Sequence, residues 1–505
     1  MQLKGLALPL VLTGKVKGDV TGWNTSCCEG LSAELPLIHH GPSSPDYNQL
    51  ISARWSGTAI LRPACVITPR TPLDISTAIK FLVKGQCKFA VKSGGHNANP
   101  GANSIEGGVS IDLGRLNTVS LAHDRSHVSL GSGATWGQAY DTLNNSNIGF
   151  PGGVCGEVGV GGPSMGGGQS VFQASKGWIV DNVLNYEIVL ASGHVVNANE
   201  TSYQDLFKAL KGGNTNFGIV TRVDVAAFDF EGLWVGANKV SLNGPQASRP
   251  EMLDRISYAM VDFVRRNNVE RETEVQLLIS YLSGNKGQLV DFGLTNTDNM
   301  ANPPAAQNFL NIPHRLSYVA SHTNMAVYAH QNTQLLPRGF REANAGLTIM
   351  NDFKTVREIW DACDKIYNSL SHKDQIDWII QLLPQPKVQQ SYAEKRGGNS
   401  LGLSDMGKDQ IVIWFMPRWK DPSLDIMMAE AQKRFIKDTE AIAKKHGTYS
   451  PFVYISYAGP TQNPLCGYGR GSASFLEQVA KKYDPYGVFQ RLMRGGFKIS
   501  QADCG

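Results

Sequence analysis

The sequence predicts an α+β fold with a two-part first domain, then an antiparallel sheet covered by helices, and a C-terminal return to the first domain. Three observations support this class. A capped amphipathic helix joins two apolar strands within residues 64–92. Short strands broken by glycine continue to about residue 228, and mixed strands and helices without glycine clusters follow. At 505 residues the chain is long enough for two or three domains.

The first predicted unit is β-α-β. Residues 64–68 form a short apolar strand, and Thr71 and Pro72 supply a helix N-cap and a proline at the first helical position. Apolar residues then repeat at helical spacing, so the helix buries one face: Ile75, Ala78, Ile79, Leu82 and Val83. Gly85 ends the helix, and residues 88–92 form the next strand.

The next region combines short strands with glycine. The best strand candidates are residues 109–113, 128–130, 187–190 and 219–223. Residues 152–162 and 166–168 are so rich in glycine that they fit neither a helix nor an ordinary strand. We expect this glycine-rich backbone to lie closely against another group.

After residue 228 the chain alternates longer helices and strands. The predicted helices are residues 250–266, 354–370 and 424–445. The predicted strands are residues 276–282, 378–383 and 411–415. Such a mixture without glycine clusters predicts an α+β domain that covers a ligand site, and residues 472–496 add a further helix and a turn.

Charge and hydropathy exclude several classes of protein. The 47 basic and 43 acidic side chains are scattered and leave a net charge of only +4, so we expect no nucleic-acid or membrane partner. No apolar run approaches the roughly 20 residues that a membrane helix needs.

No phosphate-binding loop with Gly-Lys-Ser/Thr and no His-Glu-x-x-His is present, and we predict no metal site. Gly162 to Gly166 match the hydrolase pattern Gly-x-Ser-x-Gly, but no apolar strand precedes the serine.

Several features favour the secretory route. Residues 1–25 are predicted to be a signal peptide or an N-terminal extension, because Lys4 precedes a short apolar run that reaches Thr13. Three glycosylation sequons agree with secretion: Asn24, Asn144 and Asn199. The eight cysteines include no Cys-x-x-Cys pair, which argues against zinc ribbons and thioredoxin-type redox sites. One disulfide is predicted among Cys27, Cys28 and Cys65.

Two candidate nucleophiles lie in the glycine-rich region. His96 follows the β-α-β unit directly, and Cys155 lies within the glycine run. Neutral imidazole and thiolate are groups that could bond an electrophilic cofactor ring. An isolated histidine after two glycines would otherwise be an ordinary turn residue.

Around His96 the sequence resembles a known family. The segment Lys92-Ser93-Gly94-Gly95-His96 resembles the FAD-attachment motif of the vanillyl-alcohol oxidase and p-cresol methylhydroxylase superfamily, and more narrowly its berberine-bridge-enzyme-like branch in fungi. Segments that agree in order lie at residues 69–72, 99–101, 133–137, 181–183, 216–221 and 483–489. The resemblance covers roughly residues 25 to 500. It implies an FAD-binding domain at residues 26–228, a substrate-binding domain at 229–450 and a C-terminal return at 451–505.

The resemblance also assigns the cofactor and its contacts. It implies covalent FAD, bonded through His96 and also through Cys155, because Gly153-Val154-Cys155 matches the bicovalent pattern. The pyrophosphate would lie against backbone amides of Ser93, Gly94, Gly95 and Asn97. The flavin ring and ribityl chain would lie along Val158, Gly161, Gly162 and Gly168, and the adenosine part along Gly218 and Val220. Tyr457 would reach the flavin from a C-terminal strand.

The implied activity is that of an oxidase. Hydride from a substrate C–H bond would pass to the flavin while a base takes a proton, and oxygen would leave as hydrogen peroxide. Tyr454, placed by strand alternation on the opposite face from Tyr457, is the first candidate base, and Gln381 could orient the substrate. Val158 matches an oxygen-gating position, and Lys176 stands where plant relatives often carry a tyrosine.

Three functions remain open for such a chain. The first is oxidation of a small metabolite, which could be an alcohol, an amine or a ring-closing substrate. The second is oxidation of an oligosaccharide at its anomeric carbon, and the third is a non-redox cyclisation templated by the flavin. In each case the expected partner is a small-molecule substrate, together with O2 for the two oxidases. The protein is expected to be a monomer.

Overall fold

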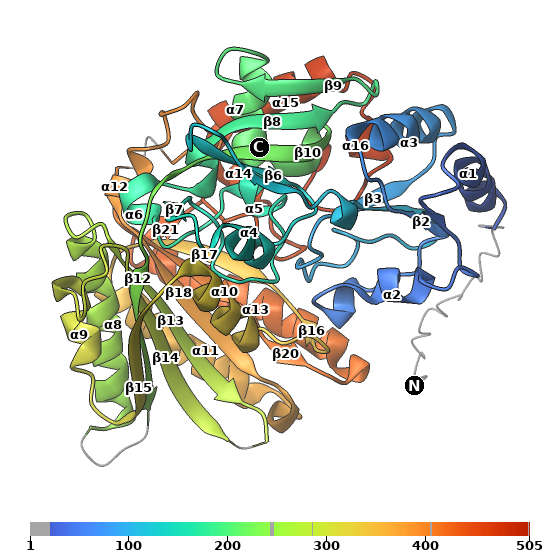
Figure 1. Cartoon of the computed structure of the whole chain (residues 1–505). Coiled ribbons are helices and arrows are strands. Elements are labelled where there is room, and N and C mark those ends of the chain that lie inside the picture. Colours follow the sequence, from blue (N-terminus) through green and yellow to red (C-terminus); the bar gives the residue numbers. More distant parts are fainter. Residues whose placement is uncertain (1–20, 243–246, 285, 404–406, 503, 505) are drawn as a thin grey trace, which may run out of the picture.

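The computed structural model describes residues 21–242, 247–284, 286–403, 407–502 and 504. It confirms the α+β class, with a four-stranded, a five-stranded and an eight-stranded sheet arranged around a common centre (Figure 1). The predicted signal segment from Lys4 to Thr13 lies outside the described residues. Within them, no helix is both long and apolar enough to cross a membrane.

The four-stranded sheet contains the predicted β-α-β unit. Its order is β1-β2-β4-β3, and β2 and β3 both run parallel to β4, which lies between them. The strands are β1 (His39–His40), β2 (Cys65–Ile67), β3 (Phe89–Lys92) and β4 (Val109–Asp112), and α3 (Pro72–Lys84) connects β2 to β3. Thr71 and Asp74 form the capping box at the start of α3, which confirms the predicted N-terminus.

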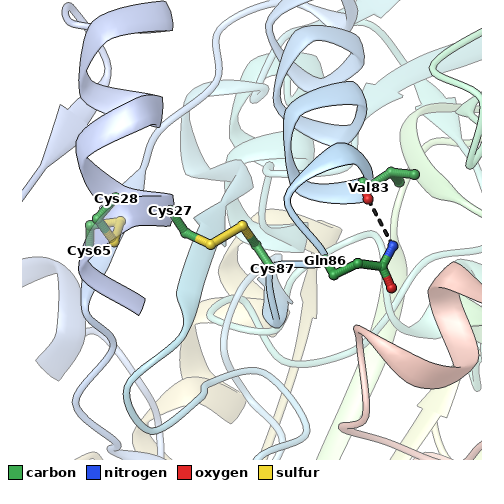
Figure 2. Close-up of a disulfide and its surroundings, with 6 residues drawn as sticks. All are labelled: Cys27, Cys28, Cys65, Val83, Gln86 and Cys87. Atoms are coloured by element: carbon green, nitrogen blue, oxygen red, sulfur yellow. Dashed lines mark hydrogen bonds between the residues drawn. A yellow bond between two sulfur atoms is a disulfide. The ribbon is translucent and has the colours of Figure 1, made fainter. Parts of the chain in front are cut away.

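Two disulfides attach α1 (Thr21–Glu34) to this sheet (Figure 2). Cys28 bonds Cys65 in β2, which confirms that one disulfide forms among Cys27, Cys28 and Cys65. Cys27 bonds Cys87 just before β3, and a third disulfide, Cys466–Cys504, lies near the C-terminus. Neither of these two disulfides was predicted from the sequence.

The five-stranded sheet is antiparallel and has the order β5-β6-β10-β8-β9. Its strands are β5 (Val119–Leu121), β6 (His127–Gly131), β8 (Val183–Val189), β9 (Val195–Asn199) and β10 (Ile219–Ala226). The glycine-rich run between β6 and β8 forms loops and two one-turn helices, α5 (Pro163–Gly166) and α6 (Gln173–Lys176). Residues 152–162 form neither a helix nor a strand, as predicted, whereas Gly166 was expected to lie outside any helix and belongs to α5.

The eight-stranded sheet is antiparallel throughout and has the order β15-β12-β14-β13-β18-β19-β17-β21. Its strands are β12 (Leu233–Ser241), β13 (Thr273–Leu282), β14 (Gly287–Asn296), β15 (Arg315–Thr323), β17 (Ala345–Met350), β18 (Trp378–Gln385), β19 (Gln410–Phe415) and β21 (Tyr449–Ser450). One face packs in an apolar core against α8 (Arg249–Arg266), α11 (Phe353–Ser369) and α13 (Asp425–Lys445). The predicted antiparallel sheet covered by helices is therefore confirmed.

The opposite face of this sheet is turned toward the other two sheets. Helix α10 (Met325–Leu335) follows β15 and packs against α4 (Trp136–Leu143), which belongs to the glycine-rich half (Figure 1). Further along the chain, α15 (Gly469–Tyr483) packs against α7 (Gln204–Gly213). The C-terminal part thus contacts the first part of the chain.

Short elements complete the fold. They are α2 (Tyr47–Ser52), β7 (Ile148–Gly149), β11 (Phe228–Asp229), α9 (Gln307–Leu310), β16 (Arg341–Glu342), α12 (Lys387–Gln390), β20 (Arg418–Trp419), α14 (Pro464–Gly467) and α16 (Val488–Arg491). One expectation is wrong: residues 454–457 are a turn and not a strand, because the Tyr457 N–H donates to the Tyr454 carbonyl at 2.9 Å.

Candidate functional site

A cavity of about 330 Å³ lies where the three sheets meet. It is lined by all the predicted site residues except one: Ser93, Gly94, Gly95, His96, Asn97, Cys155, Val158, Gly161, Gly162, Gly218, Val220, Gln381, Tyr454 and Tyr457. Gly168 does not line it, since this glycine packs against Ile179 and its N–H donates to the Tyr454 hydroxyl at 3.0 Å. The structure thus gathers residues from five separate parts of the sequence around one space.

One wall of the cavity is bare backbone. A Cβ atom added to Gly94 would lie 2.3 Å from the Gly159 nitrogen, so these two segments touch through glycine alone. The Ser93 hydroxyl donates to the Ser132 carbonyl at 2.5 Å and accepts from the Gly161 N–H at 3.3 Å. Beside them, Gly162 has open space where a side chain would stand. This wall can hold an extended anionic ligand through backbone amides.

His96 stands at the end of this wall, in the loop after β3. Its ring stacks on Trp55 with centroids 4.4 Å apart and planes 8° apart. Its Nε2 atom is buried and has no hydrogen-bond partner among the described residues. Burial, with the nearby positive charge of Arg338, lowers the pKa of His96 to about 3. The imidazole is therefore neutral at physiological pH and keeps its nucleophilic lone pair.

Cys155 presents a second nucleophile from the glycine-rich loop. It is 6% exposed and free, and the other free cysteine, Cys363, lies in the core beneath the eight-stranded sheet. The Cys155 sulfur lies 3.7 Å from the Thr333 hydroxyl, which donates its own proton to the Ala329 carbonyl. Thr333 therefore accepts from the thiol and orients it. Burial raises the pKa of Cys155, so the thiol form predominates.

Helix α10 holds the loop that carries Cys155. The Gly156 N–H donates to the Ala329 carbonyl at 3.0 Å, and the Asn332 side chain donates to the Val154 carbonyl at 3.0 Å. These bonds join the eight-stranded half of the protein to the glycine-rich half directly at the cavity.

Tyr454 and Tyr457 face the same cavity. Because residues 454–457 form a turn, the two rings meet edge to face at 4.7 Å and do not point to opposite sides, as strand alternation would have placed them. Burial raises the pKa of Tyr454 to about 12. Tyr457 stacks on Trp414 with centroids 4.1 Å apart, and its hydroxyl donates to the Gln169 side chain at 3.2 Å.

The sheet side of the cavity holds Gln381 and the carboxyl of Glu274, which was not among the residues predicted from the sequence. The Gln381 side chain donates to the Gln276 side chain at 3.3 Å. Glu274, on the same face of β13 as Gln276, accepts from the Gln173 side chain at 3.0 Å and from the Ala174 N–H at 3.3 Å. The alternation of polar Glu274 and Gln276 with buried Val275 and Leu277 was the available signal.

Lys176 is not part of the cavity wall. Its ammonium lies 4.1 Å from the centre of the Phe228 ring, and burial lowers its pKa. Lys176 therefore packs away from the cavity.

Comparisons with known proteins agree with this geometry. Residues 63–199 match the FAD binding domain family. The chain is 31% identical to the FAD-dependent monooxygenase sdcF of Emericella nidulans over 485 residues, which are 94% of this chain and 98% of that protein. It is also 31% identical to the FAD-dependent monooxygenase tpcD of Cochliobolus heterostrophus, covering 93% and 92% of the two chains.

Solved structures share the fold at low sequence identity. Glucooligosaccharide oxidase from Acremonium strictum, whose flavin is described as 6-S-cysteinyl, 8α-N1-histidyl FAD, aligns with a TM-score of 0.75 at 19% identity over 92% of this chain and 97% of that one. 6-Hydroxy-D-nicotine oxidase from Arthrobacter nicotinovorans aligns with a TM-score of 0.74 at 17% identity over 91% and 97%.

The cavity fits FAD in two respects that belong to this structure. The bare backbone wall leaves main-chain amides that could bind an extended diphosphate, and His96 lines the cavity with a buried Nε2 that has no hydrogen-bond partner among the described residues. Together with the identity to curated fungal relatives, these observations show that the chain belongs to the family of FAD-dependent oxidoreductases that includes these relatives.

Proposed function

We propose that this enzyme is an oxidase in which FAD, bonded to His96 and Cys155, takes hydride from a C–H bond of a small metabolite and passes the electrons to O2, giving H2O2. The observation that carries the proposal is the pairing of two nucleophiles, a neutral imidazole and a free thiol, in the wall of one cavity. The substrate would be an alcohol, an amine or a ring-closing metabolite.

The residues of the wall would hold the cofactor. Backbone amides of Ser93 to Asn97 would bind the diphosphate, Val158, Gly161 and Gly162 would lie along the ring and ribityl chain, and Gly218 and Val220 along the adenosine. Bound FAD supplies a two-electron acceptor that O2 can reoxidise. Gly168 would act through its hydrogen bond to Tyr454 and not by direct contact.

Tyr454 is our candidate for the base. It would have to release a proton that it holds with a pKa of about 12. The Gly168 N–H, which donates to the Tyr454 hydroxyl, would stabilise the phenolate as it forms. Gln381, fixed by its bond to Gln276, would orient the substrate from the opposite wall.

Val158 would control the approach of oxygen. Its backbone is fixed on both sides, because its N–H donates to the Cys155 carbonyl at 3.2 Å and its carbonyl accepts from the Trp136 N–H at 3.0 Å. Its side chain is half-buried and lines the cavity. A larger side chain at this fixed position would narrow the passage.

A second candidate function is monooxygenation. It is favoured by the names of the fungal relatives at 29–32% identity. Turnover under ¹⁸O2 separates the two, since an oxidase leaves the label in peroxide and a monooxygenase places one labelled atom in the product. The oligosaccharide oxidase and the non-redox cyclase are the remaining alternatives. Bleaching of the flavin by a metabolite under anaerobic conditions would exclude the cyclase.

The flavin bonds are tested by acid precipitation of the purified holoenzyme. We expect the fluorescence of flavin to stay with the protein pellet, and a release into the supernatant would refute covalent attachment. His96→Ala and Cys155→Ala should each remove one bond and together release the flavin. Cys363→Ala is the matched control, because it removes a buried thiol that lies outside the cavity.

We also propose that the protein follows the secretory route and acts as a monomer on its small-molecule substrate. The three disulfides support the oxidising compartment that this route provides. Of the sequons, Asn144 is exposed at the C-terminal end of α4, whereas the Asn199 amide bonds Asn185 and the following turn. We therefore place a glycan on Asn144.

A further inference from the structure

The charges that line the cavity are unequal. Among the described lining residues one has a carboxyl side chain, Glu274, and none is lysine, arginine or aspartate. A substrate with an anionic group would therefore meet no counterion there. A substrate with a cationic group would meet a carboxyl.

Glu274 is buried but has no ionic partner. It is 6% exposed, and within the described residues it takes part in no salt bridge. Its two hydrogen-bond donors, the Gln173 side chain and the Ala174 N–H, are neutral amides. Burial raises its pKa well above the ordinary value, so the group is a neutral acid until a cation approaches.

Gln173 provides an independent observation at the same place. Its side-chain nitrogen donates both to Glu274 and to the Pro384 carbonyl, each at 3.0 Å, which fixes the orientation of the amide. Its Oε1 atom is then a buried acceptor without a hydrogen-bond partner among the described residues, and the side chain is 3% exposed. Buried acceptors are normally satisfied, so this oxygen is free to accept a hydrogen bond from a donor that enters the cavity.

Glu274 and Gln173 together would favour a ligand with several N–H donors. A carboxylate and an amide oxygen can each accept one N–H of a protonated amine, whereas an ether or carbonyl oxygen would leave the Gln173 acceptor unmet. We propose that Glu274 and Gln173 form a subsite for a basic nitrogen of the substrate. The same cavity is also lined by neutral polar side chains: Gln276, Asn332 and Gln381.

The proton balance of this subsite is simple. An amine that arrives as an ammonium ion replaces the proton of the Glu274 carboxyl, which leaves to solvent, and an ammonium–carboxylate pair remains. Return of one N–H proton from the ammonium to the carboxylate then gives the neutral amine that can release hydride. The inference rests on the proposed oxidase function and narrows its substrate from alcohols, amines and ring-closing metabolites to amines.

The test uses the FAD-loaded enzyme and pairs of probes that differ only in nitrogen and oxygen: benzylamine with benzyl alcohol, and tryptamine with indole-3-ethanol. Binding is measured by isothermal titration calorimetry in buffers of different ionisation heat. We expect at least one amine to bind about tenfold tighter than its alcohol, as for a hydrogen bond to a charged group, with release of close to one proton.

Glu274→Gln should abolish both the preference and the proton release, and Glu274→Asp should keep part of each. Glu187→Gln is the control, since this carboxylate pairs with Arg222 on the five-stranded sheet. Equal binding of amine and alcohol, a preference that survives in Glu274→Gln, or no binding of any amine would overturn the proposal. If Glu274→Gln does not fold, proton release by the wild type alone decides.

Flavin bleaching by the same probes is recorded separately. A Glu274-dependent preference without bleaching would support the subsite and reject the oxidase function for these amines. Bleaching by an alcohol that is unaffected in Glu274→Gln would support the oxidase and reject the subsite.

Discussion

Alanine substitutions at two glycines of the cavity wall can test separately how the wall packs and where the cofactor binds. Gly94→Ala would place a Cβ atom 2.3 Å from the Gly159 nitrogen and 2.6 Å from its Cα, and ordinary contact begins at 3.4 Å. Two backbone segments would have to separate by about 1 Å, for which overpacking costs of about 3 kcal/mol are expected. Gly162→Ala places its Cβ in open space, with nothing within 4 Å and with helical backbone angles.

The two variants should therefore behave differently. Gly94→Ala should lower the free energy of unfolding and lose flavin, whereas Gly162→Ala should stay within about 1 kcal/mol of wild type and lose flavin alone. Unfolding is followed by circular dichroism in denaturant, and flavin content by absorbance after purification. Wild-type stability of Gly94→Ala would refute the close packing of the wall. Full flavin content in Gly162→Ala would refute the placement of the cofactor along Gly162.

Three further predictions follow from named contacts. Val158→Leu should slow flavin reoxidation by O2 at least about tenfold without changing anaerobic reduction, measured by stopped flow; equal reoxidation would exclude gating. Replacing Cys27 and Cys87 by serine removes a disulfide that spans 60 residues and should lower the free energy of unfolding by about 4 kcal/mol. An unchanged midpoint of denaturant unfolding would contradict this prediction. Glu274 has a raised folded-state pKa, so the wild type loses stability as pH rises above the ordinary value of 4.5, whereas Glu274→Gln does not. The stability of the variant relative to wild type should therefore rise with pH, and a constant difference would contradict the raised pKa.

The first half of the chain was the more predictable part. The Thr71 cap, Pro72 and the apolar spacing of α3 act locally, so residues next to each other in sequence decide the element. The glycine-rich wall was predictable because its backbone excludes regular structure. The position of β4 between β2 and β3 depends on pairing at a distance and had no local signal.

Other features depend on tertiary context. Residues 454–457 were expected to form a strand, yet a hydrogen bond within the segment makes them a turn. The edge strand β15 is exposed on both faces and so shows no alternation that a sequence could reveal. Glu274 resembled an ordinary polar position of a strand, because its significance lies in the absence of a cation nearby.

The hydrogen bonds between α10 and the Cys155 loop have a consequence for biosynthesis. Thr333, Ala329 and Asn332 belong to the half of the chain that is made later, and they orient a thiol in the half that is made earlier. A ribosome-bound fragment that ends before α10 contains the cysteine but not the helix that aims it. A thioether from Cys155 would then form only after the two halves have packed together. A chain that carries this bond must therefore have been translated at least through α10 and folded around it.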